Sequence, residues 1–442
     1  MATTKSLPLS GKPCTCGKKH QFNSQIITGK GVISEIPDVL KNYGAIFPYI
    51  IFDVNTYKVA GEKLCKILKD NGIMFASFCY EENSLEPDEN AIEKALTNMP
   101  ADCDIVIGVG SGVINDISKI VSDKKDKKFI IVATAPSMDG YASSSSSVIL
   151  SGVKTTISSH PADVIIGDID VLKNAPIDML ISGVGDMLAK YVSICEWRIG
   201  ALICDEYYCE EIAKLVRDSV KQVVESANSL LSRDETAVSK VFDALIIGSV
   251  AMNYAGMSRP ASGTEHYISH VLDMRGVEFK SPVRFHGIQC AFGTLVTVKL
   301  YEKLKNVMPN KEKALEYAKN FDVERWNKSL KSLLGKSAIN LIELEKKEKK
   351  YDCQKHQKRL DKIIDNWDKI LKIIDEEIPS SNELELLMKK LGLPTSAKQL
   401  SIDNALLPEI FKATKDIRDK YVLSRLLWDL GIIDEFADSL YQ

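Results

Sequence analysis

The 442-residue sequence lacks a long hydrophobic run and an excess of charge of one sign. No segment has the roughly 20 uncharged apolar residues that a membrane-spanning helix needs. The N-terminus, MATTKSLPLSGKPC, has no apolar core of the signal-peptide type. Lys and Arg number 57 and Asp and Glu 60, and a formal net charge of -3 argues against nucleic-acid binding by the whole protein. We therefore expect a cytoplasmic protein with no membrane span and no nucleic-acid partner.

Cysteine is also sparse. Ten cysteines are too few for a disulfide scaffold and predict reduced thiols. Cys14 and Cys16, followed by His20, form the one cysteine cluster. They are three candidate zinc ligands at tight spacing without an obvious fourth. The alternative is a turn of small residues that precedes the first strand.

The first 180 residues alternate short apolar runs with helical patterns. The runs YIIFDV (49–54), DIVIGVG (104–110), FIIVATAP (129–136) and DVIIGDIDVL (163–172) predict buried strands. Helical spacing follows the first of them in VAGEKLCKILKDNG and the second in VINDISKIVS. This alternation predicts βαβ units and a largely parallel sheet. The serines at 143–147 interrupt the pattern, and we expect a surface hairpin or a ligand-facing loop there.

Past about residue 180 strand patterns nearly disappear. Helical spacing predicts helices in residues 179–200, 211–231, 238–257, 317–330 and 360–378. In the last segment a single apolar stripe contains Leu360, Ile363, Ile364, Trp367, Ile370, Leu371 and Ile374. The charge-rich segment 342–362 is expected to be a solvated helix face, with a docking surface for an acidic partner as the alternative. The fold class is therefore α/β plus all-α, with a Rossmann-like domain over 1–178 and a helical domain over 179–442.

A glycine-rich turn joins the second predicted strand to its helix. In IGVGSGVIND, Gly108, Gly110 and Gly112 stand where the backbone could approach an anion at a helix N-terminus. The pattern is not a strict GxGxxG, so a merely tight turn is the alternative. Asp53, at the end of the first predicted strand, could accept hydrogen bonds from a ribose and disfavour the extra phosphate of NADP. An N-cap within DVNT is the other interpretation of Asp53.

Three of the six histidines fall between residues 266 and 286. His266 and His270 are four residues apart, so they share a helix face. His286 follows a loop, and Asp186 is expected to open a helix in GVGDMLAK. Two imidazoles and one carboxylate would bind a metal ion and leave a position open for substrate. The alternative is that the two histidines one turn apart only share a helix surface.

Five motifs occur in the order GVGSGVINDISK, ATAPSMDGYASSSS, GVGDMLAK, SGTEHYISH and HGIQCAFG, with CTCGKKH near the N-terminus and RDKYVLSRLLWDLGIID near the C-terminus. This series resembles the sn-glycerol-1-phosphate dehydrogenases, most closely their bacterial branch. That family belongs to the superfamily of glycerol dehydrogenase, iron-containing alcohol dehydrogenases and 3-dehydroquinate synthase. Val109 is a departure, because relatives often have a further glycine there.

The resemblance implies an NAD(P)-binding domain and a helical domain that binds metal and substrate. The implied nucleotide contacts are Asp53, Gly108, Gly110, Gly112, Val113, Ile114, Asn115, Asp116, Thr134, Ala135, Pro136, Ser137 and Ser143. The implied metal ligands are Asp186, His266 and His286, for one divalent ion of zinc, nickel or iron. Asp139 and His270 are the implied catalytic residues and, with Asp186, would contact substrate. A homodimer is a further expectation.

The resemblance implies reversible NAD(P)H reduction of dihydroxyacetone phosphate to sn-glycerol 1-phosphate. The metal would act as a Lewis acid on the carbonyl, and His270 or a water would supply the proton. Lys190, Arg259 and Arg284 are candidate phosphate contacts, although a surface role is the alternative for each. Two other functions remain open, namely a polyol dehydrogenase acting on an unphosphorylated substrate and a non-catalytic NAD(H) sensor.

Overall fold

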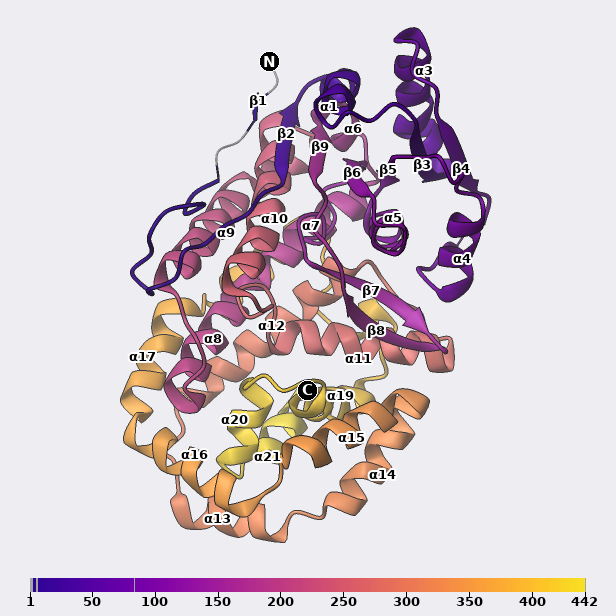
Figure 1. Cartoon of the computed structure of the whole chain (residues 1–442). Coiled ribbons are helices and arrows are strands. Elements are labelled where there is room, and N and C mark those ends of the chain that lie inside the picture. Colours follow the sequence, from indigo (N-terminus) through magenta and orange to yellow (C-terminus); the bar gives the residue numbers. More distant parts are fainter. Residues whose placement is uncertain (1–2, 5–6, 83, 442) are drawn as a thin grey trace. The chain divides into compact units, whose positions relative to one another are not determined.

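The computed structural model describes residues 3–4, 7–82 and 84–441 of the chain (Figure 1). The chain forms two compact units: Met1–Val184 with Lys221–Gly256, and Gly185–Val220 with Met257–Gln442. Helices α7 (Ile177–Leu188) and α9 (Glu210–Leu230) each contribute residues to both units. The expected domain boundary after residue 178 separates the α/β part of the chain from the helical part, whereas each compact unit combines two separate stretches of chain. The expected domain division therefore stays a prediction.

The first unit is built on a seven-stranded sheet in the order β1-β2-β9-β6-β5-β3-β4. All neighbouring pairs are parallel except β1 with β2. The strands are β1 Thr3–Thr4, β2 Gln25–Gly29, β3 Pro48–Asp53, β4 Ala76–Tyr80, β5 Ile105–Gly110, β6 Lys128–Ala133 and β9 Val164–Asp168, and a separate hairpin holds β7 Ser145–Leu150 and β8 Val153–Ser158. The predicted parallel sheet is confirmed.

The four strands predicted from apolar runs are the interior strands β3, β5, β6 and β9. Their side chains are almost all buried, as expected for parallel strands covered on both faces. The prediction over 163–172 was wrong at its end. There, the strand stops at Asp168, whose carboxylate accepts a hydrogen bond from Asp170 N and begins helix α6 (Ile169–Leu172).

Strands β2 and β4 were not predicted. The side chains of β4 are mostly half-exposed because it is an edge strand, so its sequence ASFCY shows no buried run. The serine-rich segment does form a hairpin, since Ser145 at the start of β7 pairs with Ser158 at the end of β8.

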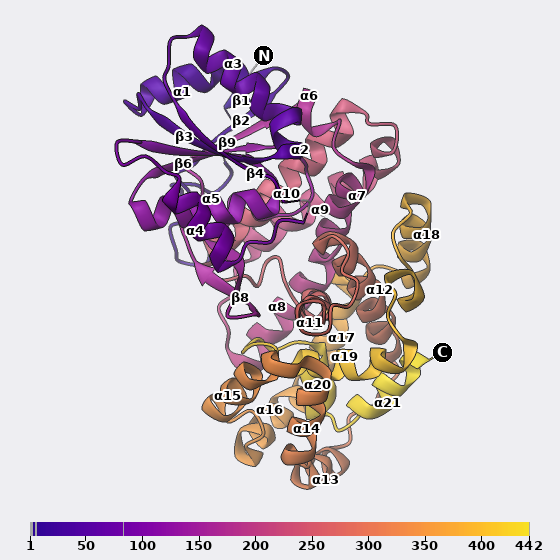
Figure 2. The same ribbon diagram turned by 90° about the vertical axis from the view of Figure 1, so that its right-hand side faces the viewer.

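Helices cover both faces of the sheet (Figure 2). On one side lie α1 (Ile36–Asn42) and α3 (Glu62–Asp70), which bury Leu40, Leu64 and Leu68 against the strands. On the other side lie α4 (Glu89–Thr97) and α5 (Gly112–Lys125). Each fully buried leucine contributes about 1.5–3 kcal/mol. The short helix α2 (Val54–Thr56) follows β3, and α10 (Glu235–Ala255) also belongs to this unit.

The second unit is helical, and no strand follows Asp168 within the described residues. Its helices are the second part of α7, α8 Lys190–Cys204, the first part of α9, α11 Thr264–Phe279, α12 His286–Leu304, α13 Lys311–Asn320, α14 Val323–Leu334, α15 Ala338–Glu348, α16 Cys353–Asp365, α17 Trp367–Glu377, α18 Ser381–Leu391, α19 Leu407–Ala413, α20 Leu423–Asp429 and α21 Ile433–Asp438. The expected helical C-terminal region is confirmed.

Three predicted helices are interrupted. The segment 179–200 is divided between α7 and α8 at Ala189. The segment 317–330 is divided because Asp322 accepts a hydrogen bond from Arg325 N and caps α14. The stripe over 360–374 spans two helices that meet at Asn366, although its members are still buried or half-buried.

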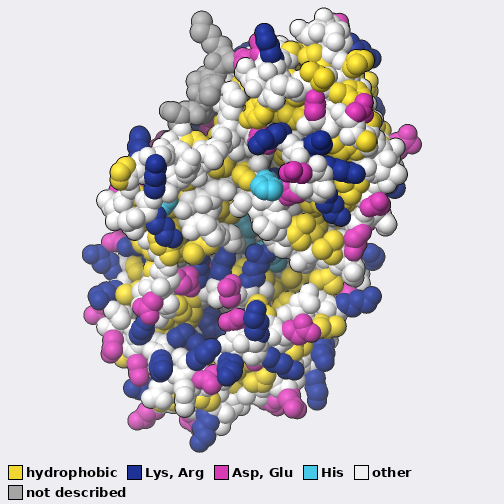
Figure 3. All heavy atoms as spheres, viewed as in Figure 1, with side chains coloured by type: hydrophobic (Ala, Val, Ile, Leu, Met, Phe, Trp, Pro, Cys, Tyr) yellow, Lys and Arg dark blue, Asp and Glu magenta, His cyan; other side chains and the backbone are white. Residues whose placement is uncertain are grey.

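In the charge-rich segment 342–362, ten of the 21 side chains are exposed, seven are half-buried and four are buried, so the segment is a solvated face only in part. Lys350 is half-buried, and its Nζ donates to the carbonyl oxygens of Asp416 and Arg418. On the face shown in Figure 3, Lys and Arg side chains are interspersed with Asp and Glu. Within the described residues, no helix combines the length and the apolar character needed to cross a membrane.

Candidate nucleotide and metal sites

The carboxyl ends of three neighbouring strands bring together the residues predicted to contact a nucleotide. Asp53 ends β3 and Gly110 ends the adjacent β5. Thr134 follows β6, and its N–H donates to the Gly110 carbonyl at 3.2 Å. The connection from β3 goes outward to β4, and the chain then returns to β5 on the other side. Parallel sheets bind ligands at such a reversal of strand order.

The glycines of the turn are required by close packing. A Cβ at Gly110 would lie 2.4 Å from the Cβ of Ile114, and one at Gly108 would lie 2.7 Å from Ser118 Oγ. Helix α5 starts directly after this turn and has no acidic residue in its first turn. Its free N–H groups and the positive end of its dipole can therefore bind an anion such as a diphosphate.

Asn115 has a buried acceptor without a partner. The residue is completely buried, and its Nδ2 donates at 3.4 Å to Asp116 Oδ1 and to the Gly140 carbonyl. Its Oδ1 has no hydrogen-bond partner. Buried acceptors are normally paired, so this atom fits a donor from a bound ligand.

Charged groups also stabilise the loop that follows β6. Lys119 is buried, and its Nζ donates to the carbonyls of Gly140 and Ser143 at 2.7 and 2.9 Å. Burial lowers the pKa of Lys119 to about 8. Burial also raises the pKa of Asp116 to about 6, although Lys119 acts in the opposite direction. Ser147 N donates to Asp116 Oδ2.

Asp53 is an N-cap in this structure. Its Oδ1 accepts from Asn55 N and Thr56 N at 2.8 and 2.9 Å, and its own N–H donates to Thr56 Oγ1. The N-cap within DVNT, which was the alternative interpretation of Asp53 from the sequence, is therefore confirmed. A role at the ribose stays a prediction, because capping and ligand binding can use different oxygens of one carboxylate.

The other predicted nucleotide residues line the same loops. Ser137 Oγ lies 2.7 Å from Ser111 Oγ, and the Ala135 carbonyl accepts from Tyr141 Oη at 2.6 Å. Ser143 Oγ lies 3.0 Å from Ser145 Oγ. Ile114, Thr134, Ala135, Pro136, Ser137 and Ser143 are buried, and Gly112 and Val113 are half-buried.

In the second unit, the structure brings Asp186, His266 and His286 together. They come from α7, α11 and α12, and α11 and α12 pack closely. The expectation that Asp186 opens a helix was wrong, because α7 begins at Ile177 and Asp186 lies near its C-terminal end. His266 Nε2 lies 3.5 Å from Asp186 Oδ1, and the centroids of the two imidazole rings are 5.0 Å apart. A Cβ at Gly185 would lie 2.2 Å from the Gly287 carbonyl oxygen, so a glycine allows this approach of α7 to α12.

Neighbouring groups fix both imidazoles. Glu265 Oε1 lies 2.8 Å from His266 Nδ1. A carboxylate only accepts, so Nδ1 carries the proton and Nε2 remains for a metal ion. Ser269 Oγ lies 3.2 Å from His286 Nδ1, so Ser269 contacts the His286 ring at the same nitrogen at which Glu265 contacts the His266 ring.

Sequence reasoning did not identify Cys290. Its Sγ lies 3.5 Å from His286 Nε2, and its thiol, His266 and His286 present donor atoms within 4.8 Å of one another. Cys290 follows His286 by one helical turn, and this spacing was a signal available in the sequence.

The charges of the cluster suit a cation. Burial opposes ionisation of Asp186, but Lys190, whose Nζ is 2.9 Å from Asp186 Oδ1, and the two histidines hold its pKa well below the ordinary value. Burial lowers the pKa of His266 and of His286, but Cys290, as a thiolate, and the Asp186 carboxylate raise the pKa of both rings above the ordinary value. Negative groups that stabilise protonated imidazoles would also stabilise a metal ion, so the donors fit a divalent cation.

The two predicted catalytic residues lie in different units. His270 is half-buried beside His286, with ring centroids 6.2 Å apart and nearly parallel planes. Asp139 is half-buried in the first unit, where its backbone carbonyl accepts from Ser249 Oγ.

Two of the candidate phosphate contacts are buried rather than exposed. Lys190 is the partner of Asp186, and Arg259 Nε donates to Glu206 Oε2 at 2.6 Å. Arg284 is exposed.

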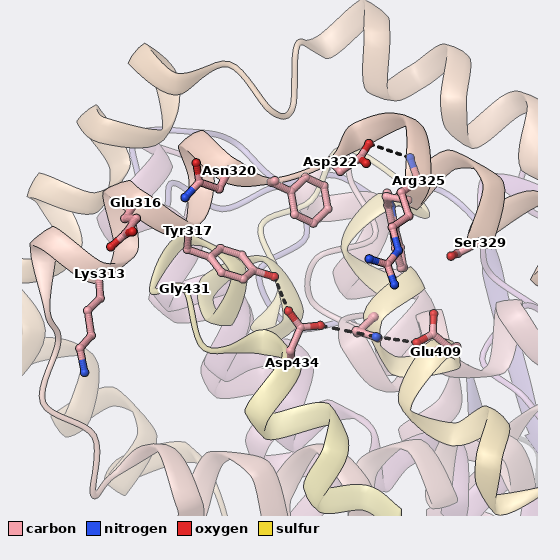
Figure 4. A pocket seen from close by; sticks show the side chains of 13 residues that line it. Lys313, Glu316, Tyr317, Asn320, Asp322, Arg325, Ser329, Glu409, Gly431 and Asp434 are labelled. Carbon is pink, nitrogen blue, oxygen red and sulfur yellow. Dashed lines mark hydrogen bonds and ion pairs between the residues drawn. The ribbon is translucent and has the colours of Figure 1, made fainter.

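A separate pocket of about 700 Å³ lies in the second unit (Figure 4). Tyr317 Oη donates to Asp434 Oδ2 at 2.7 Å, and Lys412 pairs with Glu409 and Asp434. None of the predicted site residues lines this pocket. Tyr317, Glu409, Lys412 and Asp434 are thus joined to one another, and we assign the pocket no part in the chemistry.

Comparisons with known proteins agree with this geometry. Residues 27–176 match the family described as iron-containing alcohol dehydrogenase. A glycerol-1-phosphate dehydrogenase (NAD(P)+) of Bacillus velezensis is 33% identical over 302 residues, which cover 66% of this chain and 77% of the relative. One from Methanosarcina mazei is 34% identical over 287 residues, covering 64% and 78%. One from Halalkalibacterium halodurans is 28% identical over 415 residues, covering 93% and 94%.

Solved structures share the fold. Glycerol dehydrogenase from Schizosaccharomyces pombe has a TM-score of 0.60 and 17% identity, covering 94% of this chain and 90% of that one. An iron-containing alcohol dehydrogenase from Thermococcus thioreducens has a TM-score of 0.61 and 15% identity, covering 96% and 99%.

The sheet with its glycine turn, the buried histidine cluster and these matches define an NAD(P)-dependent alcohol oxidoreductase that uses a metal ion. Within that class, the chain belongs to the glycerol-1-phosphate dehydrogenase family.

Proposed function

We propose that the chain is a glycerol-1-phosphate dehydrogenase that uses NAD(P)H and one divalent metal ion to interconvert dihydroxyacetone phosphate and sn-glycerol 1-phosphate. The convergence of Asp186, His266 and His286 in one buried cluster is the observation that carries this proposal. Membership of the family supports the substrate over an unphosphorylated polyol.

Asp186, His266 and His286 would hold the metal ion, and Cys290 is close enough to be a further ligand. When bound, the metal would supply Lewis acidity toward the substrate carbonyl and the reduced nicotinamide would supply the hydride. Glu265 and Ser269 orient the imidazoles so that their Nε2 atoms stay available. Lys190 keeps Asp186 ionised, because the ammonium favours the carboxylate.

In the first unit, the N-terminus of α5 would bind the diphosphate of the nucleotide through backbone N–H groups. Asn115 Oδ1 would accept a hydrogen bond from the nucleotide. Asp53 would accept from the adenosine ribose, which favours NAD over NADP.

Two residues would act on the substrate. His270 would donate the proton that the reduced substrate oxygen takes up, and its half-buried ring beside His286 supports this role. Asp139 would accept a hydrogen bond from a substrate hydroxyl. Zinc, nickel and iron are all compatible with two imidazoles and a carboxylate. We also propose a homodimer, which light scattering of the purified protein would test.

The proposal is tested by replacing one ligand. In His266→Ala we expect loss of the bound metal and of dihydroxyacetone phosphate reduction, with an unchanged circular dichroism spectrum. The matched control is His160→Ala, because His160 is exposed and pairs only with Asp123 among the described partners. Full metal content in His266→Ala would remove this residue from the ligand set.

The substrate is tested separately. The wild-type protein should reduce dihydroxyacetone phosphate in preference to dihydroxyacetone, and the product should be the sn-1 phosphate. Preference for dihydroxyacetone would indicate a polyol dehydrogenase. Absence of turnover with zinc, nickel and iron in turn, despite NADH binding, would favour an NAD(H) sensor.

A further inference from the structure

The N-terminal segment of the first unit contains a second group of metal-ligating side chains. Residues 7–24 form no regular strand or helix beyond an isolated bridge between Pro13 and Lys19. Within this segment Cys14, Cys16 and His20 place their donor atoms within 4.8 Å of one another. We propose that these three residues bind a structural zinc ion, distinct from the metal of the catalytic cluster.

The backbone presents the two thiols on the same side of a tight turn. Gly17 N donates to the Cys14 carbonyl at 3.0 Å, and Cys14 N donates to the Lys18 carbonyl at 3.2 Å. Gly17 has a φ of +80°, which glycine adopts without strain. Cys14 and Cys16 are half-buried, whereas Thr15, Gly17 and Lys18 are exposed. The turn therefore directs its sulfur atoms inward.

His20 is oriented as a metal ligand. Its side chain is 2% exposed, and its Nδ1 lies 3.1 Å from the carbonyl oxygen of Tyr254 at the end of α10. A carbonyl only accepts, so Nδ1 carries the proton and Nε2 is left with its lone pair. Metal-bound histidines are usually held by this kind of contact. The His20 ring also packs on the Tyr254 ring, with centroids 5.4 Å apart.

The spacing of the donors suits zinc. Cys16 Sγ lies 3.4 Å from His20 Nε2. Zn–S and Zn–N bonds of about 2.3 and 2.0 Å in a tetrahedron place sulfur and nitrogen about 3.5 Å apart. Two thiolates and an imidazole favour zinc over magnesium or calcium. A thiol-to-imidazole hydrogen bond has a similar length, so measurement must separate these interpretations.

A metal ion here would explain how an irregular segment is ordered. Outside this cluster, Tyr254 Oη of α10 donates to the Pro8 carbonyl at 2.7 Å, and Ser10 Oγ donates to the Phe22 carbonyl at 3.3 Å within the segment itself. Zinc would cross-link Cys14, Cys16 and His20 and stabilise the folded form of the segment. Three protein ligands leave a fourth tetrahedral position for a water or another side chain.

The experiment measures zinc per chain in full-length protein purified without a metal-binding tag from zinc-supplemented cells. We compare the wild type, Cys16→Ser, His266→Ala, the double variant Cys16→Ser/His266→Ala and the control Cys353→Ser, which changes an exposed thiol. Cys16→Ser should lose one equivalent of zinc whether or not His266 is also replaced, and should retain turnover. Equal zinc in Cys16→Ser and the wild type would overturn the proposal. The single variant His266→Ala tests the proposed function and not the structural zinc site, because it should lose only the catalytic metal.

A second measurement does not depend on a folded variant. The wild-type protein is alkylated with iodoacetamide, with and without a zinc chelator, and the modified cysteines are identified by mass spectrometry. We expect Cys14 and Cys16 to be protected at least tenfold until the chelator is added, whereas Cys353 reacts equally in both samples. Equal reaction of Cys14 and Cys16 in both samples would show that a hydrogen bond, not zinc, holds the cluster.

Discussion

Replacement of Glu265 by Gln should weaken metal binding without removing a ligand. Glu265 Oε1 accepts two hydrogen bonds, from His266 Nδ1 at 2.8 Å and from Gly263 N at 2.7 Å. A glutamine carbonyl has the same shape and can accept both. The change therefore removes the negative charge and leaves the orientation of the imidazole nearly as it is.

The expected magnitude follows from the role of the carboxylate. Partners of metal-bound histidines change metal affinity by about 10–100-fold when replaced. Because Glu265→Gln retains the geometry, we expect the lower part of this range, about tenfold or roughly 1.4 kcal/mol. Glu265→Ala also frees the ring, so the loss should approach 100-fold. Ser269→Ala should have a smaller effect, since its hydroxyl is neutral and lies 3.2 Å from His286 Nδ1.

The assay is a competition titration of the metal-free protein against a chelator of known affinity, with NADH oxidation followed in parallel. Turnover in Glu265→Gln should return to within a few-fold of the wild type at saturating metal. If Glu265→Gln and the wild type bind the metal equally tightly, the charge of the Glu265 carboxylate does not strengthen metal binding by His266. That result would refute the role inferred from the contact between Glu265 and His266 Nδ1.

Substitutions at three further positions test other parts of the structure. Asp53→Gly should raise kcat/KM with NADP relative to NAD, and Asp53→Asn, which keeps an N-cap, should do the same; an unchanged ratio would exclude a ribose contact. Gly110→Ala should weaken NADH binding at least tenfold in a fluorescence titration, because its Cβ would meet Ile114 at 2.4 Å; unaltered affinity would exclude close packing as the reason for the glycine. Asp416→Asn should lower the free energy of unfolding in urea by about 3–5 kcal/mol at neutral pH, since it leaves the buried Lys415 and Arg425 cations without their carboxylate. Burial opposes ionisation of Asp416, but those cations depress its pKa well below the ordinary value. The contribution of Asp416 to the free energy of unfolding is therefore present above about pH 4 and is lost as the pH falls further. The variant should lose less stability than the wild type in that acid range, and an equal loss would argue against a depressed pKa.

The interior of the sheet was readable from the sequence because parallel strands buried on both faces are continuous apolar runs. The strands β3 and β5 show this directly. The edge strand β4 carries no such signal, since most of its side chains are half-exposed. Helix boundaries such as Asn366 were missed because the apolar stripe continues through the break.

The metal cluster was only partly predictable. Spacing and resemblance pointed to Asp186, His266 and His286, which come from three helices. Glu265 precedes His266 directly, and helical spacing alone does not place neighbouring residues on one face, so its contact with the ring depends on the local geometry. Lys190 was a candidate phosphate contact, with a surface role as the alternative, because the sequence does not reveal that its ammonium is buried against Asp186.

The central claim is that one divalent cation is held by Asp186, His266 and His286. Anomalous diffraction from crystals of the metal-loaded enzyme, collected at the absorption edge of the added metal, tests it most directly. We predict a peak within bonding distance of all three side chains in an enzyme that reduces dihydroxyacetone phosphate. A fully active enzyme without a peak there would contradict the account.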